Sequence, residues 1–178
     1  MSGEPEGRID PLVRLAREAI EAYVRDRTVI EPVQLPEMEP RRAGVFVSLH
    51  RTDGSLRGCI GTTQPTRATI EEEVVGNAIS AASRDPRFYP LTPAELDDLD
   101  ISVDVLGPAE EVNGLADLDP KEYGIIVRTA DCRQALLLPD LEGVDTPEQQ
   151  LRITCRKGGI DPDLDRYCLS RFRVERHH

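Results

Sequence analysis

The stretch LRGCIGT, residues 56–62, places an arginine, a cysteine and two glycines on one short segment. Residues 44–50 alternate large apolar side chains with others, and the Asp-Gly pair at 53–54 is a common hairpin turn. We therefore predict a β-hairpin whose second strand carries the LRGCIGT stretch. Since successive side chains of a strand point to opposite faces, Arg57 and Cys59 are expected on one face, roughly 7 Å apart.

Gly58 and Gly61 are the second notable feature of this strand. Glycine weakens a strand, and its usual reason there is a bulge or the close approach of another backbone or of a ligand. We interpret the two glycines as room beside Arg57 and Cys59, which favours a binding or catalytic site over a purely structural hairpin.

Cys59 is the candidate nucleophile or proton donor. A neighbouring guanidinium can lower the pKa of a thiol, so that a thiolate forms at neutral pH. The base would be His50, the one internal histidine, which the hairpin register brings close to Leu56. The alternative is that Cys59 is a buried structural residue, which is the commoner role of a single cysteine on a strand.

Arg57 is a candidate anion-binding residue, because a planar guanidinium binds carboxylate or phosphate through two parallel hydrogen bonds. The segment SRDPRFYPL, residues 83–91, adds Arg84 and Arg87 as further binding candidates. Asp85 in the same segment is either a catalytic acid or base, or a turn-forming acceptor. The alternative for the arginines is pairing with the chain's own carboxylates.

Helices and strands follow one another in mixed order along the chain, with no repeating βαβ unit. Helices are predicted where a capping residue or a proline precedes apolar residues at helical spacing, at 10–27, 68–83, 92–98 and 146–158. Strands are predicted from alternation at 101–105, 123–128, 133–138 and 168–174. Prolines punctuate an extended, wrapping connection at 32, 36 and 40, and the acidic segment 110–121 is expected to form turns. This order predicts one α+β domain over residues 1–178, in which a smaller lobe is allowed.

The composition excludes several functional classes. A formal charge of −11 and an aromatic content of 4% make nucleic-acid binding unlikely. The four cysteines lack the paired spacing of a metal site, and the chain has no phosphate-binding glycine motif, so no metal and no particular cofactor is predicted. The absence of a long apolar run and of a signal-peptide core leads us to expect a cytoplasmic protein without a membrane span.

The blocks LRGCIGT, SRDPRFYPLTPAEL and the later GIIV, LLLP and CRKGGI together resemble the AMMECR domain family, which includes protein A of the AmmeMemoRadiSam systems. The resemblance covers nearly the whole chain. It implies an α+β domain of two unequal lobes, with an antiparallel sheet flanked by helices and a cleft near the RGC strand. The family's second block falls on Arg84, Asp85, Arg87 and Phe88. After LLLP, relatives commonly have a glutamine and a Trp-Asp pair, where this chain has Asp140 and 144–145.

Two functional hypotheses follow, and whether the protein is an enzyme stays open. The first is a small-molecule or catalytic cleft with Cys59 and Asp85 as catalytic residues. Its binding residues would be Arg57, Gly58, Gly61, Arg84 and Arg87. The second is a non-catalytic interaction module for the radical S-adenosylmethionine and Memo-like proteins that the resemblance implies as partners, with Cys59 filling space.

Overall fold

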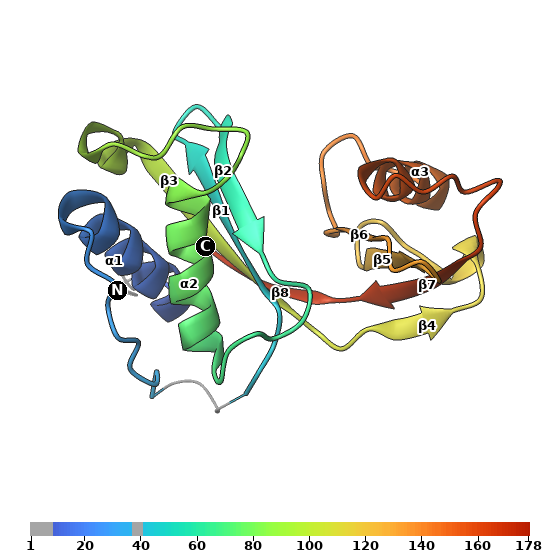
Figure 1. The fold of residues 1–178 in the computed structure, drawn as a ribbon, viewed down its shortest axis with the longest axis horizontal. Coiled ribbons are helices and arrows are strands. Elements are labelled where there is room, and N and C mark those ends of the chain that lie inside the picture. Colours follow the sequence, from blue (N-terminus) through green and yellow to red (C-terminus); the bar gives the residue numbers. More distant parts are fainter. Residues whose placement is uncertain (1–8, 37–40) are drawn as a thin grey trace, which may run out of the picture. The chain divides into compact units, whose positions relative to one another are not determined.

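The computed structural model describes residues 9–36 and 41–178, and these divide into two compact units (Figure 1). The first unit contains the described residues up to Val105 together with Arg176–His178, and the second contains Leu106–Glu175. Within the described residues, each unit is built on a four-stranded sheet. Both sheets combine antiparallel pairs with packed helices, so the predicted α+β class is confirmed.

Two helices form one layer of the first unit. Helix α1 (Pro11–Asp26) begins after Asp10, whose carboxylate accepts the N–H of Leu12 at 2.8 Å, and it ends at Arg27 in the left-handed conformation. Helix α2 (Ile70–Ser83) begins after Thr69, whose hydroxyl accepts the N–H of Glu72. These caps lie where the sequence predicts them, because short polar side chains satisfy the first free N–H groups of a helix.

The first sheet has the strand order β2-β1-β3-β8, with β2 at one edge. Its strands are β1 (Val45–Arg51), β2 (Leu56–Gly61), β3 (Leu99–Leu106) and β8 (Val174–His177). Val45, Val47 and Leu49 of β1 are fully buried and share one core with α1 and α2. The helices therefore cover the face of β1 that carries these three residues.

The register of the predicted hairpin is observed in the structure. Ser48 of β1 lies opposite both Cys59 of β2 and Ser102 of β3, and His50 lies opposite Leu56, as predicted. The β1–β2 register shifts between Leu49 and His50, which is the sign of a β-bulge.

Two irregular segments complete the first unit. A 3₁₀ helix, η1 (Pro93–Asp98), follows the segment 84–92 and leads into β3. The extended connection after α1 lies against α2, where the carboxylate of Glu71 accepts the N–H of Leu35 at 3.0 Å. The wrapping connection is thus observed at Pro32 and Pro36, and Pro40 lies outside the described residues.

The second unit packs one helix on its sheet. The sheet has the order β4-β7-β5-β6, formed by β4 (Glu110–Val112), β7 (Tyr167–Phe172), β5 (Gly124–Thr129) and β6 (Gln134–Leu137). Helix α3 (Pro147–Lys157) buries Leu151 and Cys155 against Ile125 and Val127. A short 3₁₀ helix, η2 (Leu115–Asp117), follows β4.

Two of the predicted elements of the second unit need correction. The segment expected to form only turns contains β4, whose sequence Glu-Glu-Val has no apolar alternation that would indicate a strand. The strand predicted at 168–174 is two strands, β7 and β8, which belong to different sheets. Alternation continues across the break at Arg173, so the pattern alone does not locate it.

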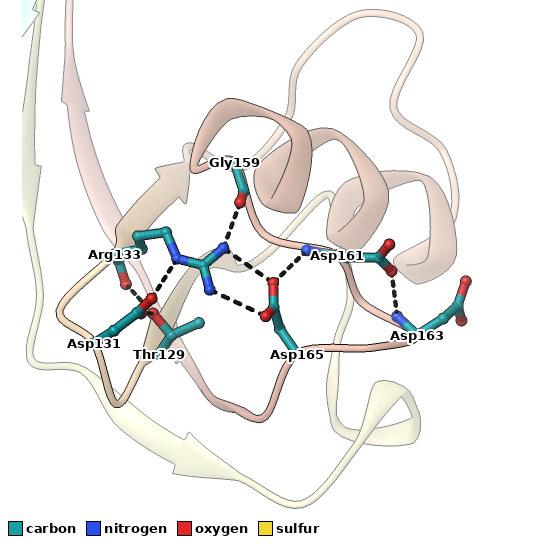
Figure 2. A network of polar contacts seen from close by, with 7 residues as sticks. All are labelled: Thr129, Asp131, Arg133, Gly159, Asp161, Asp163 and Asp165. Atoms are coloured by element: carbon teal, nitrogen blue, oxygen red, sulfur yellow. Dashed lines mark hydrogen bonds and ion pairs between the residues drawn. The ribbon is translucent and has the colours of Figure 1, made fainter.

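Arg133 organises the loops at one end of the second sheet (Figure 2). Its guanidinium donates two hydrogen bonds of 3.0 Å to the carboxylate of Asp165 and one of 2.9 Å to Asp131. It also donates to the carbonyl of Gly159, just after α3. Arg133 therefore joins the loop that follows α3, through Gly159 and Asp165, to the β5–β6 turn.

In the described ranges, no helix has the length and apolar character needed to cross a bilayer.

Candidate functional site

The peptide groups of Cys59 lie on the free edge of β2 and are satisfied by one ion pair. The N–H of Cys59 donates to Asp85 Oδ2 at 2.9 Å, and Arg87 Nη2 donates to the carbonyl of Cys59 at 3.3 Å. An edge strand has unpaired donors and acceptors that attract other strands. The Asp85–Arg87 pair thus occupies a position that a neighbouring strand would otherwise take.

Asp85 is the most heavily committed carboxylate of this site. It is 4% exposed, and it accepts from the backbone N–H of Arg87 at 3.1 Å and from Arg87 Nε and Nη2 at 3.0 and 2.8 Å. These hydrogen bonds from Arg87, together with that from Cys59, lower the pKa of Asp85 to about 2. Asp85 is therefore ionised at neutral pH and has several donors around it, a setting that suits an anchor better than a general base.

Arg57 is enclosed rather than open to a ligand. Its side chain is 6% exposed, and its Nε and Nη2 donate to the two carboxylate oxygens of Glu95 at 2.8 and 3.2 Å. Nη2 also donates to the carbonyl of Tyr89 at 3.1 Å, and the guanidinium lies 5.8 Å from the ring centre of Phe88. The bidentate hydrogen bonding that was predicted for an external anion is thus made to Glu95 of the same chain.

The expectation that Arg57 activates Cys59 is not supported by the structure. The bulge places Leu56 opposite His50 and Gly58 opposite Leu49, which leaves Arg57 as the extra residue that interrupts the alternation of β2. Burial raises the pKa of the Cys59 thiol, although a hydrogen bond donated by Ser48 Oγ at 3.2 Å and the charge of Arg87 act in the opposite direction. The thiol is half-buried, and its raised pKa disfavours a thiolate, so a reactive Cys59 stays a prediction.

Gly58 and Gly61 are explained by packing within the chain. A Cβ atom at Gly58 would lie 2.4 Å from the carbonyl oxygen of Ala81 in α2. One at Gly61 would lie 2.2 Å from the ring of Phe46. The close approach that the glycines predict is observed, but the neighbours are a helix backbone and an aromatic side chain, so the glycines leave no space for a ligand.

Arg84 has an exposed side chain, as Arg87 does, but it lies apart from the other candidates. It is the C-cap residue of α2, and its side chain lines a cavity of about 200 Å³ between the outer surface of α2 and residues 29–32. Cys59, Arg57 and Asp85 do not line this cavity. The structure therefore separates the predicted site residues into two places.

A larger cavity lies in the second unit. It measures about 520 Å³ and is lined by residues 111–115, Leu151 and 167–169. The described residues that line it include no basic side chain.

Glu95 and Tyr89 are the site residues that the sequence analysis missed. Glu95 occupies the third position of the predicted capping box at Thr92, and it does accept the N–H of Thr92 at 2.9 Å. The same carboxylate also pairs with Arg57, which is 38 positions earlier. Because the capping box alone accounts for a glutamate at position 95, the sequence does not indicate that Glu95 also pairs with Arg57. Arg57 holds the pKa of Glu95 down, at about 2.

The positions at which the third block departs from the family pattern lie beside Lys121. The Nζ of Lys121 is 3.8 Å from the carboxylate of Asp140 and 3.4 Å from that of Asp145. Asp140 has a positive φ of 55°. These contacts are exposed and contribute little to stability.

The fold and the two motif segments define a class of α+β protein in which the RGC strand and the segment 84–91 form one hydrogen-bonded unit. Comparison with known proteins places the chain in a particular family: it belongs to the AMMECR1 family, whose model matches residues 13–177. The predicted family membership is confirmed.

Three proteins similar to this chain have names that describe no function. A protein of Thermotoga maritima is 54% identical over 172 residues, covering 94% of this chain and 97% of its own length. A Clostridium acetobutylicum protein is 47% identical over 94% of this chain, which spans 36% of that longer protein. A crystal structure of an uncharacterized protein from Pyrococcus horikoshii is similar with a TM-score of 0.84 and 36% identity, covering 93% of this chain and 88% of the other.

Proposed function

We propose that this protein is an interaction module, and that the segment 84–91 is the surface it presents to a partner protein. The observation that carries the proposal is Tyr89, whose side chain is 91% exposed within a segment that is held on both sides. Tyrosine contributes strongly to protein interfaces because its large ring loses little conformational entropy on binding.

The backbone on both sides of Tyr89 is held by the rest of the first unit. Arg57 binds the carbonyl of Tyr89, and the N–H of Leu91 donates to the carbonyl of Ala82 at 2.8 Å. Leu91 is buried, and Asp85 anchors the other end of the segment on Cys59. A segment ordered before binding loses less entropy on association, so this arrangement favours recognition.

The charged groups of the LRGCIG strand and of the segment 84–91 act as supports in this proposal. Arg57 and Arg87 flank the ring of Phe88 at 5.8 and 5.5 Å from its centre, and each also holds a carboxylate. The family signature then serves to position residues 88–89. The radical S-adenosylmethionine and Memo-like proteins implied by the family resemblance are the proposed partners.

Binding of the purified partners to surface variants tests this function. We expect Tyr89→Ala to weaken binding of one of the two partners about tenfold or more, because an exposed aromatic anchor is removed. Val33→Ala is the matched control, since Val33 is also well exposed, at 77%, but lies on another segment. Cys59→Ser should bind like the wild type. Failure of both partners to bind, or equal binding by Tyr89→Ala, would refute the proposal.

A catalytic cleft around Cys59 is the second candidate function. The observation in its favour is that the Cys59 thiol is half-buried rather than fully enclosed. The Ser48 hydroxyl of the neighbouring strand β1 donates a hydrogen bond to it. With its pKa raised, Cys59 would serve as a proton donor rather than as a nucleophile. A Cys59→Ser variant that retains partner binding but loses turnover of a metabolite would favour this candidate.

A further inference from the structure

The cavity on the outer surface of α2 contains two arginine side chains that have no acid partner among the described residues. Arg67 and Arg84 both line it, both are exposed, and no hydrogen bond or ion pair within the described residues engages either guanidinium. Both contrast with Arg57, Arg87 and Arg133, whose guanidinium groups are held by carboxylates of the chain.

Gly76 explains how Arg67 is held in the cavity. A Cβ atom at Gly76 would lie 2.6 Å from Nε and Nη2 of Arg67, so the guanidinium rests directly on the helix backbone. Glycine inside a helix costs about 1 kcal/mol relative to alanine. Glycine at position 76 therefore costs helix stability but leaves room for a guanidinium that has no acid partner in the described ranges.

The remaining lining is mostly apolar. Val29 and Ile30 come from the connection after α1, and Val75 and Ile79 come from α2. Among the described residues of the lining, Glu72 is the one carboxylate, and it accepts the N–H of Ala68 at 3.0 Å. The lining residues that the structure describes therefore carry one more positive than negative charge, in a chain whose formal charge is −11.

We propose that this cavity binds a small organic carboxylate, with its charge on Arg67 and Arg84 and its apolar body against Val29 and Ile79. Guanidinium groups without partners suit an oxyanion, and the apolar lining favours a carboxylate with a hydrocarbon body over inorganic phosphate. The volume of about 200 Å³ limits the ligand to a small one, since a cavity of roughly 150 Å³ accommodates benzene.

Titration with benzoate tests the proposal, with the amide resonance of Gly76 in a ¹H–¹⁵N spectrum as the readout. We expect benzoate to shift this resonance saturably. Benzamide, which has the same ring without the charge, and inorganic phosphate, which has the charge without the ring, should produce no saturable shift. Equal shifts with benzamide or with phosphate, or no saturable shift with benzoate, would overturn the proposal.

One variant and its control locate the binding. Arg84→Gln should weaken benzoate binding about tenfold, because a charged hydrogen-bond donor is lost. Arg156→Gln, which removes an exposed charge from α3, is the control and should leave the dissociation constant unchanged. Wild-type affinity in Arg84→Gln would contradict the assignment.

Gly76→Ala separates binding from folding. The new methyl group displaces only the flexible end of Arg67, so the fold is retained and the helix gains stability. We expect a higher melting temperature together with weaker benzoate binding. A higher melting temperature with unchanged affinity would exclude Arg67 from the site.

Discussion

The strand edge at Cys59 and the cavity at Gly76 use arginine in opposite ways, although both belong to the first unit. At the strand edge, Arg57 and Arg87 are held by Glu95 and Asp85. At the cavity, Arg67 and Arg84 have no such partners in the described chain. Arginines already satisfied by carboxylates of the chain hold a structure in place, whereas unpaired ones in a hollow are available to a ligand.

Among substitutions at the strand edge, the largest loss of folding stability is expected at Asp85. Asp85→Ala removes the acceptor of the Cys59 N–H and the partner of Arg87, and should lower the free energy of unfolding by about 3 kcal/mol. Urea denaturation measures this loss. Asp97→Ala, which removes an exposed carboxylate, should change stability by less than about 0.5 kcal/mol. Similar values for the two variants would break the comparison.

Glu95→Gln should have a smaller effect. The amide keeps the shape of the carboxylate and can accept from Arg57, but it loses the charge that strengthens both hydrogen bonds. We expect a loss of about 1–2 kcal/mol in the same denaturation assay. Glu142→Gln serves as the control, since Glu142 is exposed on the other unit. A neutral Glu95→Gln would indicate that Arg57 is not held by charge.

Acid should weaken the strand edge selectively. The pKa values of Asp85 and Glu95 are about 2 in the folded protein, below their ordinary 3.8 and 4.5. Because the folded pKa values are depressed, the stabilisation is complete above about pH 5 and is lost as the pH falls from there towards 2. Denaturation curves at pH 7, 5 and 3 measure the slope, which should be shallower in Asp85→Asn. An unchanged slope in that variant would argue against the pairing.

The smallest expected effect concerns the thiol. Since burial raises the pKa of Cys59, its thiolate population at pH 7 should be low. Iodoacetamide should therefore modify Cys59 at least about tenfold more slowly than the exposed Cys132, as followed by peptide mass spectrometry. Preferential modification of Cys59 would restore the reactive-cysteine hypothesis.

Much of the fold was accessible from local signals. The caps at Asp10, Thr69 and Thr146 predict three helices, and alternation with an Asp-Gly turn predicts the β1–β2 hairpin. These signals act within a few residues, so one sequence contains them. Strand β4 was missed because three residues with two glutamates give no pattern, and its pairing with β7 depends on residues about 60 positions later.

The candidate site was accessible only in part. The sequence selects the two segments that meet, the LRGCIG strand and residues 84–88, and the structure joins them through Asp85 and Arg87. It does not indicate which carboxylate each arginine holds, because the pairing of Arg57 with Glu95 is set by tertiary packing. The glycines were ambiguous for the same reason, since a close neighbour and a ligand impose the same requirement on the sequence.

Hydrogen exchange of the Cys59 amide tests the central claim most directly. Asp85 closes the free edge of β2, so this amide should be strongly protected in the wild type and should lose that protection in Asp85→Ala, which removes the acceptor. The amide of Ile125, within the second sheet, is the internal reference and should be unaffected. Rapid exchange of Cys59 in the wild-type protein, or equal protection in the variant, would contradict the account.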